Sequence, residues 1–167
     1  MSRLPVSRLR ALVLAAVTVV VVAPVGALTL LPADFNEMVA GSQTIVRGRV
    51  VDVQPELIAG RTSIQSVITL EVIDTIKGTA VTSVAFRVPG GRIGRYRRVV
   101  VGAPEFTAGQ EVVVFLSGRA PALPMPFGLS QGVYRVADGV VRADSTRHAL
   151  AVGEFVKQLR VVAGAAP

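Results

Sequence analysis

The sequence contains no cysteine, one histidine and few aromatic residues, which make up 5% of its 167 residues. The absence of cysteine excludes a disulfide framework, a thiol nucleophile and a thiolate zinc site. His148 alone cannot form a multi-histidine metal site, and its position beside Arg147, near a predicted helix start, favours an exposed or capping role. We therefore expect no metal and no cofactor, and a fold that depends on burial of the hydrophobic residues, 51% of the chain.

The N-terminal segment has the pattern of an export signal. Its basic residues are Arg3, Arg8 and Arg10. An uncharged apolar run follows over residues 11–22, and the small residues at 25–27 suit signal peptidase. We predict a signal peptide over residues 1–27, with cleavage after Ala27. The first two arginines do not form a twin-arginine pair, which favours the general secretory route and a periplasmic or extracellular location.

A retained membrane anchor is the alternative interpretation of this segment. No charged residue occurs between Ala11 and Asp34, so residues 11–31 reach the length of about 20 residues that a membrane helix needs. Pro24 and Gly26 interrupt the apolar span, which favours cleavage over anchoring. Both interpretations place the folded part of the chain outside the cytoplasm.

The remaining residues, 28–167, have the length of a single domain. Without the three arginines of the signal segment, the formal net charge falls from +7 to +4. The chain has 16 glycines and 10 prolines, which separate segments rich in valine and isoleucine, as expected of many short strands. Strands are predicted over residues 44–54, 63–77, 83–88, 110–118, 132–136 and 140–143, the last two forming a hairpin. Loops are predicted over residues 55–62, 104–109 and 120–127.

Two segments have helical spacing instead. Over residues 31–42, Phe35, Met38 and Val39 share one face of a predicted short helix. Gly41 is expected to end this helix in a left-handed conformation. The apolar stripe of the C-terminal segment consists of Val152, Phe155, Val156 and Leu159. The strands follow one another without the alternating helices of a parallel sheet. The predicted fold is therefore mainly β, a small antiparallel β-barrel, closed or partly open, with a short N-terminal helix and a C-terminal amphipathic helix.

Five segments carry a resemblance to known proteins. In order, they are IVRGRVVDV, LEVIDTIKG, RVPGGRIGR, VGAPEFTAGQEVVVFL and GLSQGVYRV. Through them, residues 32–162 resemble an uncharacterised family of exported bacterial proteins. The chain is also distantly similar to the netrin-like, OB-type barrels of metalloproteinase inhibitors, in which a strand like TIVRGRVV precedes one ending in KG. This likeness implies an OB-like or netrin-like barrel. Those inhibitors chelate zinc through an N-terminal cysteine, so their mechanism does not carry over.

The segment GLSQG matches the G-x-S-x-G pattern of serine hydrolases, with Ser130 as the nucleophile and Asp138, Asp144 and His148 downstream. A nucleophile elbow needs a strand before the serine and a helix after it. Here a proline-rich loop precedes Ser130, and the residues after it alternate with a period of two. We therefore interpret this segment as a turn into a strand, shaped by Gly128 and Gly132, and expect no enzymatic activity.

One stretch, FRVPGGRIGRYRR, concentrates positive charge. Its candidate ligand-binding residues are Arg92, Arg95, Tyr96, Arg97 and Arg98, which we expect to form a surface with the proline-rich loop 120–127. Guanidinium groups bind phosphate and carboxylate, so anionic lipid, lipopolysaccharide phosphate or acidic polysaccharide are candidate ligands. Nucleic acid is not expected, because an exported protein rarely meets it, despite the interleaved tyrosine. A solvated hairpin without a ligand is the alternative for this stretch.

These features predict a non-catalytic, exported binding module for an anionic ligand of the envelope or the extracellular space. The membrane would be contacted only through the N-terminal segment if it is not cleaved. The first alternative is a protein-binding module, a protease inhibitor or an accessory domain with an exported protein as partner, which only the netrin-like resemblance suggests. A serine hydrolase acting through Ser130 is the third hypothesis.

Overall fold

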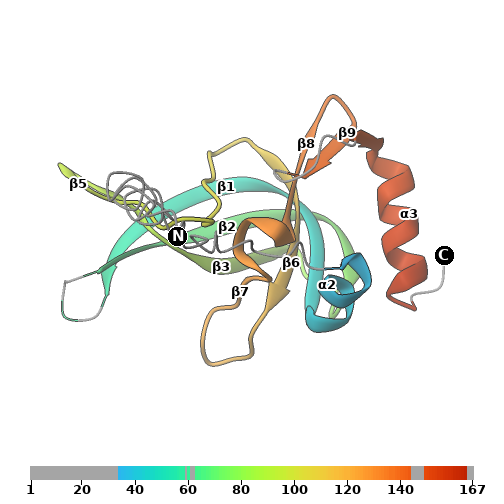
Figure 1. Cartoon of the computed structure of the whole chain (residues 1–167), viewed down its shortest axis with the longest axis horizontal. Helices are drawn as coiled ribbons and strands as arrows, with labels where there is room; N and C mark the ends of the chain where they lie inside the picture. Colours follow the sequence, from blue (N-terminus) through green and yellow to red (C-terminus); the bar gives the residue numbers. More distant parts are fainter. Residues whose placement is uncertain (1–33, 59, 61–62, 144–148, 165–167) are drawn as a thin grey trace, which may run out of the picture. The chain divides into compact units, whose positions relative to one another are not determined.

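The computed structural model describes residues 34–58, 60, 63–143 and 149–164 (Figure 1). The predicted signal peptide over residues 1–27, the alternative anchor over 11–31, and the positions of Asp144 and His148 lie outside these described residues.

The described part of the chain is mainly β, as predicted, and every strand pairing is antiparallel. The main sheet has the strand order β10-β9-β8-β6-β1-β2-β3, and β7 pairs with β6 beside this path. Its strands are β1 (Thr44–Ile58), β2 (Ser63–Lys77), β3 (Ser83–Pro89), β6 (Glu111–Ser117), β7 (Met125–Pro126), β8 (Val133–Ala137), β9 (Val140–Ala143) and β10 (Ala149–Ala151). A separate hairpin consists of β4 (Gly91–Ile93) and β5 (Tyr96–Arg98).

The two longest strands, β1 and β2, pair over almost their whole length and curve together (Figure 1). Three register shifts interrupt their pairing, the last between Val50 and Asp52. Such bulges bend a strand and increase its twist. β1 also pairs with β6, but only over Thr44 to Arg49. Beyond that point β1 continues with β2 alone, and this extension forms one wall of the pocket described below.

Both faces of the central strand β6 are buried, as its nearly continuous apolar run predicts. Residues 112–116 are each at most 1% exposed. Val112, Val114 and Leu116 belong to one apolar cluster, with Val50, Ile68, Leu70, Phe86 and Val88 from the curved strands. Val113 and Phe115 belong to a second cluster on the opposite face. The sheet therefore separates two cores, and the curved part of the sheet encloses the first.

Two helices cover the second cluster, which confirms both predicted helices. The short helix α2 (Phe35–Gly41) begins at Asp34, whose carboxylate accepts a hydrogen bond from the Asn36 N–H at 3.1 Å. The C-terminal helix α3 (Val152–Val162) buries Phe155, Val156 and Leu159, while its Glu154, Lys157 and Gln158 are exposed. In addition, Arg160 on α3 contacts both carboxylate oxygens of Asp74 on β2 at 2.7 Å. Apolar burial and an ion pair, in which one guanidinium nitrogen of Arg160 contacts both oxygens of Asp74, thus hold α3 to the sheet.

Two local predictions are wrong. Residues 55–58 belong to β1 rather than to a loop, and Pro55 is aligned with Ser66 of β2. A proline is tolerated there because β1 has left β6, so that only one of its edges is paired. Gly41 does not end α2 in a left-handed conformation. It permits close packing instead, since a Cβ at this position would lie 2.5 Å from the Phe127 ring.

The main sheet has a different strand at each of its two edges. Within the described residues, β10 and β3 are the edge strands, and no pairing between them closes the sheet. The antiparallel, mainly β class is therefore confirmed. The barrel type remains a prediction.

Candidate ligand-binding pocket

The Gly90-Gly91 pair places the β4-β5 hairpin against the curved sheet. The Gly90 N–H donates to the Ile64 carbonyl at 3.0 Å, and the hydroxyl of Ser66 donates to the Gly90 carbonyl at 2.9 Å. Both glycines have positive φ, +97° and +140°. A Cβ on Gly91 would lie 2.4 Å from the Ser66 hydroxyl oxygen. Only glycine allows the chain to leave β3 at this angle and this close to β2.

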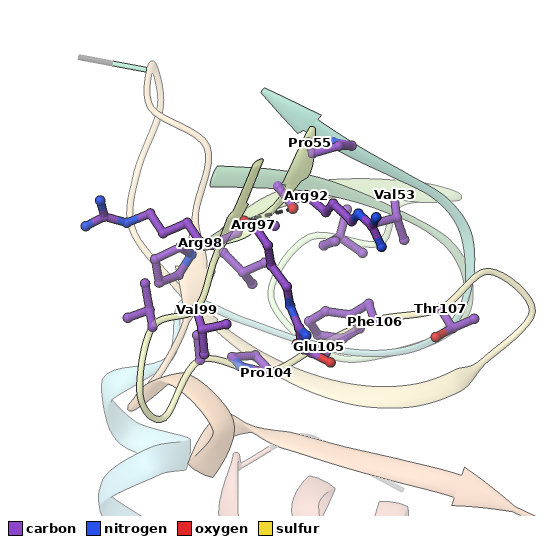
Figure 2. A pocket seen from close by; sticks show the side chains of 18 residues that line it. Val53, Pro55, Arg92, Arg97, Arg98, Val99, Pro104, Glu105, Phe106 and Thr107 are labelled. Atoms are coloured by element: carbon purple, nitrogen blue, oxygen red, sulfur yellow. Dashed lines mark hydrogen bonds and ion pairs between the residues drawn. The ribbon is translucent and has the colours of Figure 1, made fainter. Parts of the chain in front are cut away.

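A pocket of 450 Å³ lies between this hairpin and the curved sheet (Figure 2). β1, β2 and β3 contribute Val53, Pro55, Ser66, Ile68, Val88 and Pro89. The hairpin and the glycines before it contribute Gly90, Gly91, Arg92, Arg97 and Arg98. The segment after the hairpin contributes Val99, Val100 and residues 103–107. This volume is within the range of about 300–1,000 Å³ that small-molecule sites occupy.

One part of the pocket lining, its base, consists of the apolar side chains of Val53, Ile68, Val88 and Phe106. Ile68 and Val88 are buried, at 1% and 4% exposure, and their strands also contribute to the enclosed cluster. Phe106 packs edge-on against Phe86, with the ring centroids 5.4 Å apart. The hydroxyl of Ser66, which also lines the pocket, already donates its hydrogen to Gly90. The base of the pocket therefore offers a ligand hydrophobic contact more than hydrogen bonds.

The rim carries most of the charge. Three arginines and one glutamate, Glu105, line the pocket, so its lining is net positive. Arg97 forms an ion pair with Glu105 at 2.9 Å, and both side chains are largely exposed. The Nε of Arg92 donates to the Gly94 carbonyl at 3.1 Å, and Arg92 forms no ion pair with another described residue. The Arg92 guanidinium thus keeps donor groups available for an anion.

The predicted site residues separate into two groups. In Figure 2 the side chains of Arg92 and Arg97 reach over the pocket, whereas the Arg98 side chain extends away from it. Arg95 and Tyr96 are exposed and are not among the lining residues. They contact each other, because an Arg95 N–H donates to the tyrosine hydroxyl at 2.9 Å and the guanidinium lies 5.1 Å from the ring centroid. The hairpin therefore has a pocket side and an outer side.

The proline-rich loop 120–127 contributes none of the residues that line the pocket. Its end, β7, pairs with β6, and the Pro124 carbonyl accepts the N–H of Arg87 on β3 at 2.9 Å. The segment that completes the pocket is residues 103–107 instead, which the sequence showed only as a loop. Phe106 is the signal that was overlooked, since an aromatic residue in a loop rich in proline and glycine indicates a packing or binding role.

Ser130 lies in a different local structure from a nucleophile elbow. A four-residue 3-10 helix, η1 (Leu129–Gly132), contains it and is followed directly by strand β8. The Ser130 N–H donates to the Gly102 carbonyl at 3.0 Å. Asp138 is exposed at the β8-β9 turn with φ +53°, and the partners Asp144 and His148 lie outside the described residues. The predicted turn into a strand is confirmed, and the non-catalytic role remains a prediction.

No set of three or more acidic or histidine side chains in the described ranges could hold a metal ion. No helix among the residues that the structure describes is long and apolar enough to cross a membrane.

A scan against protein-family models and a search of curated proteins each find no match to this chain.

Proposed function

We propose that this chain is an exported, non-catalytic binding module, and that it binds an anionic ligand at the pocket beneath the arginine-rich hairpin. One observation carries the proposal: Arg92 and Arg97 reach over an apolar pocket whose lining contains a single carboxylate (Figure 2). Guanidinium groups form forked hydrogen bonds to phosphate and carboxylate oxygens, which makes an acidic group their natural partner.

The proposed location limits the ligand to anions outside the cytoplasm. Export follows from the signal-peptide pattern of residues 1–27. Anionic lipid, lipopolysaccharide phosphate and acidic polysaccharide are the anions that such a protein meets, and nucleic acid is not among them. No protein partner is part of the proposal, since no feature of the pocket points to one.

The type of barrel is also part of this proposal. We infer a partly open barrel of the OB type from the long curved strands β1 and β2 and from the apolar cluster that they enclose. In OB-type barrels, ligands bind on the barrel face and between its loops. A pocket between the curved sheet and a hairpin fits that arrangement.

The test replaces the three arginines that line the pocket by serine in one variant. The charge-matched control replaces three exposed cations elsewhere, Arg119, Arg142 and Lys157. Binding of the mature domain to vesicles containing phosphatidylglycerol, and separately to an acidic polysaccharide, is measured at low salt. Each basic side chain contributes about 1 kcal/mol at an anionic surface, so the pocket variant should bind roughly 100-fold more weakly.

The control variant should retain binding within a few-fold, and added salt should weaken binding of the unmodified domain. Equal losses in both variants would mean that only net charge matters, and would contradict a specific site. Unchanged binding of the pocket variant to both materials would remove the proposal.

A further inference from the structure

We propose that the ligand of this pocket is an amphiphilic anion, a molecule with one acidic group and an alkyl chain, bound one molecule at a time. This inference rests on the proposed function and specifies the chemistry of its ligand. The acidic group would lie between Arg92 and Arg97, and the alkyl chain would lie against Val53, Ile68, Val88 and Phe106.

The pocket base discriminates between an alkyl chain and a sugar. Sugars need several hydrogen-bond partners, and desolvating their hydroxyl groups without partners is unfavourable. The side chains of Val53, Ile68, Val88 and Phe106 provide none, and Ser66 already donates to the Gly90 carbonyl at 2.9 Å. An alkyl chain needs no hydrogen bond and gains free energy from leaving water. The base therefore favours the chain of a lipid-like molecule over a polysaccharide.

The rim determines where the acidic group would bind. Arg92 has no carboxylate partner in the described part of the chain, and Arg97 shares its guanidinium with Glu105 alone, at 2.9 Å on an exposed surface. Exposed ion pairs are weak, so an incoming phosphate or carboxylate can displace Glu105 at little cost. Figure 2 shows the side chains of Arg92 and Arg97 over the pocket that Phe106 also lines.

Apolar surface also continues from the base to the rim. Val99 lines the pocket and is 68% exposed, and Val101, two residues further on, is 91% exposed. A single exposed valine needs no explanation, but Val99 lies in the pocket lining itself and extends the surface on which a chain could lie. An alkyl chain longer than the pocket could thus remain in contact with the protein.

The experiment uses the mature domain and soluble alkyl phosphates below their micelle concentration. Isothermal titration calorimetry compares inorganic phosphate with hexyl, octyl and decyl phosphate, and with the uncharged octyl maltoside. Affinity should increase about fourfold for each methylene that enters the pocket, with a stoichiometry of one. Octyl maltoside and inorganic phosphate should bind far more weakly than octyl phosphate.

Two variants locate the site. Val53→Phe adds a ring to the pocket lining without changing charge, and should reduce octyl phosphate affinity by tenfold or more. Arg92→Ser should reduce it while leaving the dependence on chain length intact. Arg119→Ser is the control and should change neither quantity. Circular dichroism melts establish that each variant is folded, and the chain-length series on the unmodified domain tests the inference even if a variant fails to fold.

Several results would overturn the inference. Affinity independent of chain length, equal binding of octyl maltoside, or no binding of any alkyl phosphate would each do so. The vesicle and polysaccharide assays then decide the proposed function separately, because arginine-dependent binding to either material would persist without an alkyl site. Binding of vesicles but not of monomeric alkyl phosphate would assign the anion to a bilayer surface and would also overturn a one-molecule site.

Discussion

Gly132 is held where no side chain fits. A Cβ at this position would lie 2.4 Å from the Phe127 carbonyl oxygen and 3.0 Å from its nitrogen, both backbone atoms that cannot move independently. We therefore expect Gly132→Ala to lower the free energy of unfolding by about 1–3 kcal/mol, the usual cost of overpacking. Chemical denaturation measures the change.

Ser130, two residues earlier in the same 3-10 helix, is the matched control for Gly132. Its N–H, not its side chain, makes the hydrogen bond to Gly102, so Ser130→Ala should change the free energy of unfolding by less than about 0.5 kcal/mol. A serine-reactive fluorophosphonate probe should not label the protein. Labelling that Ser130→Ala abolishes would restore the hydrolase hypothesis.

Burial of Tyr134 makes the free energy of unfolding depend on pH in the alkaline range. It packs between Phe115 and Phe155, with centroid distances of 5.5 and 4.8 Å, and burial raises its pKa above the usual 10.0. Above pH 10 the unfolded chain loses the phenol proton more readily than the folded one. The contribution of Tyr134 to stability is therefore constant below that pH and falls as the pH rises through the folded-state pKa.

Tyr134→Phe should accordingly reduce the alkaline loss of stability, measured as the free energy of unfolding between pH 8 and pH 11, values that bracket the usual tyrosine pKa of about 10. Tyr96→Phe is the control, because Tyr96 is 61% exposed. The chain has only two tyrosines, so tyrosinate absorbance of the Tyr96→Phe variant reports on Tyr134 alone. An absorbance midpoint at or below pH 10 in that variant would contradict the expected shift.

At the scale of elements, α3 is attached mainly by its buried stripe. Leu159 is fully buried in the helix-covered cluster, so Leu159→Ala should lower the free energy of unfolding by about 2–5 kcal/mol. Val161 on the same helix is 73% exposed, so Val161→Ala should change the free energy of unfolding by less than about 0.5 kcal/mol. Thermal or urea unfolding measures both. Similar small changes in the two variants would mean that α3 contributes little to the fold.

Whether a segment forms a strand or a helix agrees closely with the periodicity of its apolar residues. The double-sided burial of β6, the β8-β9 hairpin, and the apolar stripes of α2 and α3 are all as predicted. The prediction for residues 55–58 was wrong because a proline normally marks the end of a strand, whereas here it is tolerated at an unpaired edge of β1. Whether an edge is free depends on strand order, which periodicity does not contain.

At the scale of the whole molecule, the sheet separates two apolar clusters. Helices α2 and α3 cover one of them, and the curved strands enclose the other. The pocket lies where the enclosed cluster meets the hairpin, so Ile68 and Val88 serve both the core and the pocket lining. Stability and the proposed binding site therefore share residues. Val53 is only partly buried, although it packs against the same cluster, so substitutions there disturb the core less than substitutions at Ile68 or Val88.

The candidate site was predictable only in part. The arginines were visible because they are neighbours in the sequence, and the glycines before them indicated a turn. The pocket base could not be predicted, since Val53, Ile68, Val88 and Phe106 are distant in sequence and each resembles an ordinary core residue. The expected partner of the hairpin, the proline-rich loop 120–127, was replaced by residues 103–107 because β7 pairs with β6 and Pro124 with β3.

The amino-acid sequence by itself determined the strand and helix periodicities, the positions that require glycine and the location of positive charge, because these depend on neighbours along the chain. Only the tertiary structure decided the strand order, the curvature of β1 and β2, and which arginines face an apolar pocket. Those features depend on contacts between distant segments, where the closest approach of backbones, as at Gly91 and Ser66, selects one arrangement among many that the same pattern allows.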